Sequence, residues 1–336
     1  MKTAGATAAP LIQRVYQLLA DQEFHSGTRL AAACDVSRSA IWKAIATLRE
    51  LGVTVHAVAR RGYRLPHATA MLEARRIRKA LPKAIVSQLR HGASVWSTGS
   101  TNLDLLERSG LPPGQFDFMT AEYQSSGRGR RARTWFAPPG GAICLSVSWS
   151  FQSLPPTISA LSLAIGVCAL RALNKAGVQG AELKWPNDLV AGQAKFGGIL
   201  AELRAEAAGP AFVVIGIGLN VALGEAVIDR VRSTGTAATD LVALGVTRVD
   251  RNAMVAALIS EIVAGLLQFE QQGFGAFALE WRAADALAGK VVKVTQDSGN
   301  VSGHARGIDI DGALCVQTRE GIQRFVTGDV SVRAMA

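Results

Sequence analysis

At the centre of the sequence stands Gly127-Arg128-Gly129-Arg130-Arg131-Ala132-Arg133-Thr134-Trp135, followed directly by an apolar run at 142–149. Glycines let backbone N–H groups approach a ligand, and guanidinium groups are planar, permanently charged donors that match carboxylate and phosphate oxygens. The run 142–149 is apolar enough for a buried strand. We therefore interpret 127–135, called the arginine loop below, as an anion-binding loop on a sheet.

The segments around this loop alternate between strand and helix patterns. Further strands are predicted at 199–203 and 212–220, an apolar helix at 158–176, and an amphipathic helix at 250–269 with Asp250 as N-cap. This alternation predicts a central domain, 71–286, built from a mixed sheet and helices.

The first segment, 1–67, has the pattern of a winged helix-turn-helix. Ser37 can cap a helix whose apolar stripe is Ile41, Ile45 and Leu48, and a strand at 52–58 with a basic hairpin tip follows. The segment has nine basic and four acidic residues. The second helix of such a motif enters a DNA major groove. The residues expected to face DNA are Ser37, Arg38, Ser39, Trp42, Lys43 and Arg61. The alternative is a small helical domain with solvated charges that packs against the rest of the chain.

The last segment, 287–336, contains short strand patterns separated by turn residues, with a hairpin signal at Asp311-Gly312. We expect a small, SH3-like antiparallel barrel of about five strands.

Composition limits the class of protein and its partners. A length of 336 residues with 49% hydrophobic content predicts two or three globular domains. Four widely spaced cysteines argue against a zinc site or a disulfide framework and favour a reducing cytoplasm. We expect neither a signal peptide nor a membrane span. A net charge of +10 indicates anionic partners.

Three further clusters in the central domain carry chemistry. Polar residues at 97–102 precede a helix, where they either cap it or bind small polar groups. Lys184-Trp185-Pro186-Asn187-Asp188 combines a cation with a carboxylate, and Lys195 stands beside Gly197-Gly198. Gly216-Ile217-Gly218-Leu219-Asn220 lacks the third glycine of a dinucleotide fingerprint, so we reject a Rossmann assignment. No Walker motif is present.

Together, these motifs stand in the same order as in biotin protein ligases. With the winged helix in front, residues 11–333 resemble the bifunctional subclass, a biotin ligase that also represses the biotin operon. The resemblance implies an α+β multidomain fold: a winged helix-turn-helix, a class II synthetase-like ligase domain and an SH3-like C-terminal domain. It also implies an activity: biotin and MgATP form biotinyl-5′-adenylate, and a lysine of a biotin carboxyl carrier domain then takes the biotin.

The resemblance assigns roles to individual residues. Those implied in catalysis are Arg130, Lys184, Asp188 and Lys195. Those implied in biotin binding are Ser100, Thr101, Asn102, Gln124, Gly127, Arg128, Arg130, Trp135 and Lys195. Those implied in binding ATP or the adenylate are Arg128, Arg130, Arg131, Trp135, Asn187 and Asn220, with Asp188 as a Mg²⁺ ligand. Cations at these positions would neutralise two anions as they meet, so no covalent enzyme intermediate is required.

One departure from the subclass concerns the loop 232–241, which is expected near the adenine. The repressor subclass can carry a tryptophan there, whereas this loop has no aromatic residue. In the subclass, the adenylate-bound enzyme forms a homodimer that binds operator DNA. We therefore expect DNA binding with weaker dependence on the adenylate.

Two other functions compete with this interpretation. A lipoate ligase shares the adenylate-forming architecture, but the arginine loop and the winged helix favour biotin. A transcription factor that senses a small molecule without catalysis is the second, and Lys184, Asp188 and Lys195 argue against it.

Overall fold

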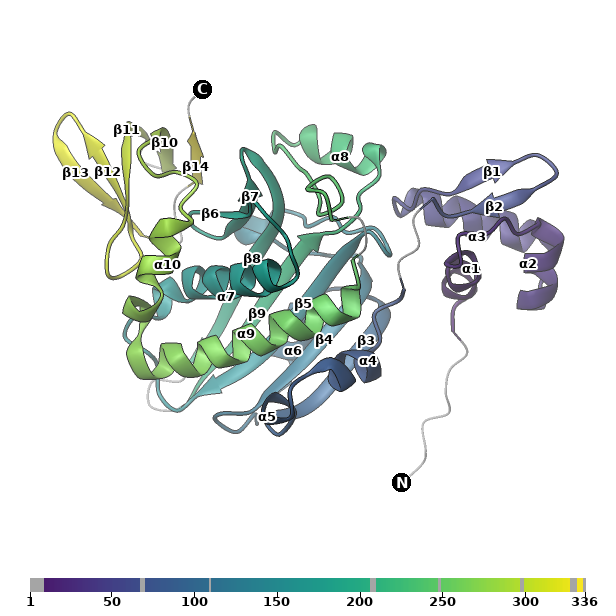
Figure 1. Cartoon of the computed structure of the whole chain (residues 1–336), viewed down its shortest axis with the longest axis horizontal. Coiled ribbons are helices and arrows are strands. Elements are labelled where there is room, and N and C mark those ends of the chain that lie inside the picture. Colours follow the sequence, from purple (N-terminus) through teal and green to yellow (C-terminus); the bar gives the residue numbers. More distant parts are fainter. Residues whose placement is uncertain are drawn as a thin grey trace.

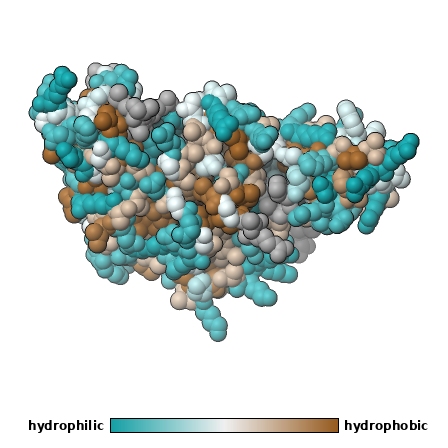
Figure 2. Space-filling view, turned by 45° about the horizontal axis from the view of Figure 1, so that its top comes forward, coloured by the Kyte–Doolittle hydropathy of each residue, from teal (hydrophilic) through white to brown (hydrophobic). Residues whose placement is uncertain are grey.

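The computed structural model of the chain describes residues 9–66, 70–108, 110–205, 210–246, 249–296, 299–326 and 331–334. It has three parts that follow the sequence. A small helical head lies beyond one end of a large central body, and a small sheet lies at the opposite end (Figure 1). On the face shown in Figure 2, hydrophilic residues cover most of the head, and a group of hydrophobic residues lies near the middle of the central body.

The head is a helix-turn-helix with a short wing. Its elements are α1 (Leu11–Leu19), α2 (Gly27–Cys34), α3 (Arg38–Glu50), β1 (His56–Val58) and β2 (Gly62–Arg64). The Ser37 hydroxyl accepts a hydrogen bond from Ala40 N, which caps α3 as predicted. The predicted strand 52–58 is wrong in its first half. Gly52 has a φ of 89°, and the buried side chains of Val53 and Val55 belong to the head's core, so pairing begins only at His56.

The central body contains a seven-stranded mixed sheet. Its strands are β3 (Leu89–Thr98), β4 (Phe116–Gln124), β5 (Ala142–Phe151), β6 (Glu182–Lys184), β7 (Asp188–Ala191), β8 (Ala194–Ala205) and β9 (Ala211–Asn220). Their order in the sheet is β3-β4-β5-β9-β8-β7-β6. Only β3 and β4 run parallel among these neighbours.

Helices cover the two faces of this sheet unequally. The helices are α4 (Ala74–Ala80), α5 (Lys83–Val86), α6 (Thr101–Leu106), α7 (Leu161–Lys175), α8 (Glu225–Arg232), α9 (Arg251–Gln272) and α10 (Ala278–Ala283). Helices α7 and α9 lie side by side across one face (Figure 1). The segments Ile158–Lys175 and Arg251–Gln272 are long and apolar enough to cross a membrane, but most of each is buried in this core, as in core helices of soluble proteins.

The C-terminal part is a five-stranded antiparallel sheet. It comprises β10 (Val291–Gln296), β11 (Gly299–Ile308), β12 (Leu314–Thr318), β13 (Gly321–Phe325) and β14 (Ser331–Ala334), in the order β13-β12-β11-β10-β14. The buried Trp185 side chain joins it to the body, because Trp185 Nε1 donates to Gly312 O at 3.0 Å. The predicted three-part fold class is confirmed.

A buried ion pair fixes the start of the central body. Arg251, the first residue of α9, donates to Glu122 of β4 at 2.8 and 2.9 Å, and neither side chain has any exposed surface. The Glu122 carboxylate also accepts from Leu72 N at 2.7 Å and from Gly140 N at 3.0 Å. The pair thereby ties the segment that leaves the head to the loop that enters β5.

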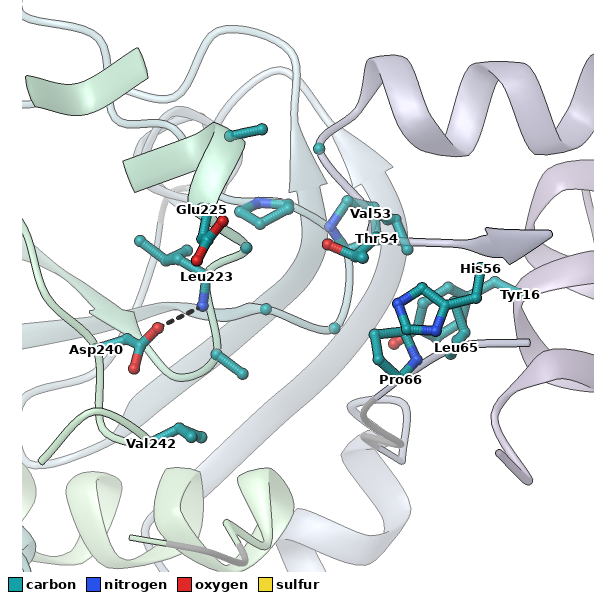
Figure 3. A pocket seen from close by; sticks show the side chains of 18 residues that line it. Tyr16, Val53, Thr54, His56, Leu65, Pro66, Leu223, Glu225, Asp240 and Val242 are labelled. Atoms are coloured by element: carbon teal, nitrogen blue, oxygen red, sulfur yellow. Dashed lines mark hydrogen bonds between the residues drawn. The ribbon is translucent and has the colours of Figure 1, made fainter. Parts of the chain in front are cut away.

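The head contacts the body through an aromatic pair, Tyr16 with Trp96 of β3 at 5.6 Å between ring centroids, and through a close approach of bare backbone. A Cβ atom on Gly52 would lie 2.9 Å from Val227 Cγ2 of α8, and one on Gly224 would lie 2.5 Å from Thr54 Oγ1. A cleft of about 590 Å³ opens beside this contact. Figure 3 shows Tyr16, His56 and Pro66 on its head side, facing Leu223, Glu225, Asp240 and Val242 on its body side.

Candidate active site

Strand directions bring the predicted site residues to one edge of the sheet. Since β3 and β4 are parallel, their carboxyl ends meet there. Gln124 is the last residue of β4, and Ser100 to Asn102 follow the end of β3. The antiparallel partners place the start of β5, the end of β9 and the start of β8 at the same edge. Lys195 thus lies near Asn220 although the two residues are 25 positions apart in the sequence.

A chain of polar side chains forms one wall of this edge. The Thr101 N–H donates to Gln124 Oε1 at 2.9 Å, and the Thr101 hydroxyl lies 2.7 Å from Ser146 Oγ. Ser146 donates to Asn102 Oδ1 at 2.5 Å. Ser100 is buried and precedes α6 without capping it through its side chain, so the capping interpretation of 97–102 is wrong for this hydroxyl.

Glu202 extends this chain of polar side chains, although no local pattern in the sequence predicts it as a site residue. Its carboxylate accepts from Asn102 Nδ2 at 2.8 Å and pairs with Arg128 Nη1 at 3.3 Å. Asn102 and Arg128 lie 100 and 74 positions before Glu202 in the sequence. Only the register of β8 against β9 brings Glu202 to this face of the sheet.

The arginine loop is a closed hairpin over the same edge. Arg128 pairs with Thr134 across it, and Trp135 N donates to Gly127 O at 2.9 Å. Gly127 is required at the base, because a Cβ there would lie 2.4 Å from Trp135 O. Arg130 and Arg131 form its tip in the 3-10 turn Arg130–Ala132, where Arg131 has a φ of 55° and an exposed side chain.

Glycines on one face of the sheet form a floor for the site. Gly216 and Gly218 alternate along β9 with buried aliphatic residues that face α7 and α9. Gly198 of the neighbouring strand β8 is paired with Gly218. A Cβ on Gly218 would lie 2.3 Å from the Trp135 ring, and one on Gly216 would lie 2.5 Å from Asn102 Oδ1. These glycines therefore lie in a strand, which agrees with our rejection of a dinucleotide fingerprint.

Trp135 closes the floor from above. Its indole N–H is buried and has no hydrogen-bond partner among the described residues. Burial without a partner costs free energy, so the N–H group is available to a ligand that enters here.

Lys195 and Asp188 form an ion pair at the centre of the edge. Lys195 Nζ lies 2.6 Å from Asp188 Oδ1 and 5.7 Å from the centroid of the Trp135 ring. The Lys195 backbone pairs with the loop 232–241, because Lys195 N donates to Ala237 O and Thr239 N donates to Lys195 O. Lys184 lies opposite Asp188 in the β6–β7 hairpin. Three residues of the predicted catalytic set thus come together.

Two predicted nucleotide contacts have internal partners. Asn187 Nδ2 donates to Ile199 O at 2.6 Å, and Asn220 Nδ2 donates to Thr239 O at 3.0 Å. Both amides therefore hold the loops that border the site.

The described residues at this edge of the sheet do not form a cluster of metal ligands. Among the described residues, no group of three or more His, Cys, Asp or Glu side chains could hold one. Mg²⁺ commonly binds through one or two carboxylates and the phosphates of a substrate. The single carboxylate of Asp188 fits a Mg²⁺ ion that arrives with a triphosphate.

A cysteine nucleophile does not fit this edge. The Cys144 side chain is buried in β5, and burial raises the pKa of its thiol to about 12. A neutral thiol is a poor nucleophile, so the site acts through charge and position.

The head presents the predicted DNA-facing residues on its surface. Trp42 is 64% exposed on α3, and Arg38, Ser39 and Lys43 are exposed on the same helix. Ser37 Oγ is occupied by the cap of α3 and lies 2.8 Å from Ser39 Oγ. Arg61, at the wing tip, lies 4.2 Å above the Phe24 ring.

Comparison with known proteins agrees with this geometry. Residues 92–220 match the biotin/lipoate A/B protein ligase family, 11–64 an HTH domain, and 288–333 the biotin protein ligase C terminal domain. The chain is 38% identical over 329 residues to the bifunctional ligase/repressor BirA of Salmonella typhimurium, covering 98% of both chains. This chain belongs to the bifunctional biotin protein ligase family.

Two more relatives of this biotin ligase support the assignment. The Escherichia coli bifunctional ligase/repressor BirA is 37% identical over 324 residues, which cover 96% of this chain and 97% of that one. The solved biotin protein ligase from Aquifex aeolicus in complex with biotin and ATP has a TM-score of 0.60 at 25% identity, covering 74% of this chain and 99% of that one. The fold of the biotin ligase family therefore extends over the central body and the C-terminal sheet.

Proposed function

We propose that this protein is an ATP-dependent biotin protein ligase that is also a DNA-binding repressor of biotin synthesis genes. One observation carries the ligase function: Lys195, Asp188 and the arginine loop meet over a floor of glycines in a chain of this family. Its substrates are biotin, ATP with Mg²⁺, and a lysine of a biotin carboxyl carrier domain.

In the first half-reaction, the cationic residues of the site bring two negatively charged groups together. The biotin carboxylate attacks the α-phosphorus of ATP, a P–O bond forms, and pyrophosphate leaves. Lys195 and the arginines offset the repulsion between these two anions, while Trp135 excludes water from the anhydride. Thr101, Asn102 and Gln124 orient the ureido ring, whose N–H and C=O groups match amide and hydroxyl partners.

In the second half-reaction, the neutral amine of the carrier lysine attacks the biotinyl carbonyl. An amide bond forms, AMP leaves, and one proton is released from the amine. Asp188 pairs with Lys195 in this structure and is freed when that cation turns to the ligand, so we propose that its carboxylate accepts this proton.

The direct test is a ligation assay. The full chain is incubated with ATP, Mg²⁺, labelled biotin and a carrier domain, and lipoate is added as competitor. We expect ATP-dependent labelling of the carrier that lipoate does not reduce. Labelling that lipoate displaces would indicate a lipoate ligase, and the absence of labelling with intact DNA binding would indicate a sensor without catalysis.

Arg130 at the loop tip is proposed to retain the adenylate. Arg130→Gly removes the proposed phosphate contact and makes the backbone at the tip of the arginine loop more flexible. We therefore expect the variant to release biotinyl-adenylate prematurely and to label lysines nonspecifically. Gel filtration of the protein with radiolabelled adenylate measures retention, with Arg306→Gly on the distant C-terminal sheet as control. Wild-type retention by the Arg130 variant would remove this role.

Repression is proposed to depend on the adenylate only weakly. The adenylate is expected to favour a homodimer that binds operator DNA through α3, but the loop 232–241 has no aromatic residue to stack on adenine. Titration of operator DNA with and without biotinyl-adenylate tests this. A change of a hundredfold or more in affinity would contradict it.

The remaining assignments are proposals of the same kind. We place the protein in the cytoplasm, as its unpaired cysteines favour a reducing compartment. The boundaries 1–67, 71–286 and 287–336 and the individual ligand contacts stay predictions.

A further inference from the structure

Glu202 is a charged side chain beside the site to which the family motifs quoted above assign no task. It lies on β8 on the same face as the glycine floor, and its side chain is only 20% exposed. We propose that Glu202 is a positioning residue that sets the orientation of Asn102 and holds Arg128 at the rim of the biotin site. This proposal rests on the ligase function proposed above.

The first support is that the hydrogen bonds of the Asn102 side chain determine the orientation of its amide group. Its Oδ1 atom faces the Ser146 hydroxyl at 2.5 Å, while its Nδ2 atom donates to Leu200 O at 3.2 Å and to Glu202 Oε2 at 2.8 Å. The opposite amide orientation would set an oxygen against the carbonyl and the carboxylate. Glu202 and Leu200 thus fix which end of the amide faces which neighbour.

The second support is the position of the other carboxylate oxygen. Glu202 Oε1 lies 3.3 Å from Arg128 Nη1, and the Arg128 side chain is 43% exposed. A long exposed side chain samples many rotamers, and a charged partner on a rigid strand narrows that range. The carboxylate therefore presents Arg128 to the ligand in a limited set of positions.

The third support is that the same carboxylate joins the two walls. Asn102 belongs to the polar chain that ends at Gln124, whereas Arg128 belongs to the arginine loop. Glu202 therefore contacts both the polar chain proposed to bind the ureido ring of biotin and the arginine loop proposed to bind the carboxylate and phosphate groups. Disturbing Glu202 should weaken substrate capture more than the chemical step.

Two variants separate these tasks. Glu202→Gln keeps an oxygen for Asn102 but removes the charge that holds Arg128, and Glu202→Ala removes both. We expect the KM for biotin to rise about threefold in the first and about tenfold or more in the second, with kcat within about twofold of wild type. Arg204→Gln, on the same strand face, is the matched control, since Arg204 donates only to Leu106 O among its described hydrogen bonds.

Coupling with Arg128 distinguishes positioning from a general structural effect. In an Arg128→Gln background, Glu202→Gln should change the KM by less than about 1.5-fold, because the partner is already gone. Wild-type protein is assayed first, and a failure of that assay refutes the ligase function itself. With an active wild type, the positioning role is overturned by an unchanged KM in Glu202→Ala, by a loss confined to kcat, or by effects that simply multiply in the double variant.

Discussion

Lys195→Ala is expected to slow biotinyl-adenylate formation by about a hundred- to a thousandfold, the usual effect of losing one aligned donor at a site of developing charge. The variant also leaves Asp188 without its cation, 2.6 Å from where Lys195 Nζ stood, so an uncompensated carboxylate faces two incoming anions. Pyrophosphate release with biotin and saturating MgATP measures this step before any carrier domain is added.

A matched lysine separates this role from the general loss of an ion pair. Lys175 on α7 forms an ion pair with Glu261 at 2.5 Å. It lies on the face of the sheet that α7 and α9 cover, away from the glycine floor. Lys175→Ala should leave pyrophosphate release unchanged. If Lys195→Ala kept more than a third of wild-type activity, the assignment of Lys195 to the reacting anions would be wrong.

Arg251→Met is expected to lower the free energy of unfolding of the central body by about 3–5 kcal/mol, the usual effect of removing one partner of a buried ion pair. Both side chains are fully buried, and the loss of Arg251 leaves the Glu122 charge with only the Leu72 and Gly140 N–H groups. Urea unfolding monitored by tryptophan fluorescence gives the midpoint and the slope.

Two further variants complete this experiment. Glu122→Leu combined with Arg251→Met removes both charges and should recover a large part of the lost stability. Arg324→Met removes an arginine from an exposed pair with Asp309 and Asp311 and should hardly move the midpoint. A wild-type midpoint in Arg251→Met alone would contradict the structural role of the pair.

Local patterns in the sequence predicted most of the fold. Ser37 and Asp250 cap the predicted helices, and alternation in 212–220 gives a strand whose glycines face one side. The family motifs predicted the meeting of Lys184, Asp188 and Lys195. These features depend on residues a few positions apart or on order along the chain, which the sequence displays directly.

Other features depend on distant register and were missed for that reason. Glu202 and Arg128 meet only because β8 pairs with β9 in one register and the arginine loop folds back over it. Glu122 and Arg251 stand 129 positions apart in the sequence, and no local pattern marks either of them as buried. At 52–58, alternation predicted a full strand, but core packing of Val53 and Val55 delays pairing until His56.

The contact at Gly52 bears on how such proteins can be rebuilt. A Cβ atom on Gly52 would lie 2.9 Å from Val227 Cγ2 of α8, which is closer than such atoms approach, and the φ of 89° also favours glycine there. Phe136, which directly follows Trp135 of the arginine loop, would be in tight contact with that atom at 3.3 Å. Arg230 of the same helix lies 4.2 Å above the Phe136 ring. A DNA-binding module transplanted from another regulator would need a bare backbone at this point of its turn. Modularity in this architecture is therefore limited by a steric fit of a few ångströms, and exchanged heads would require compensating changes in α8.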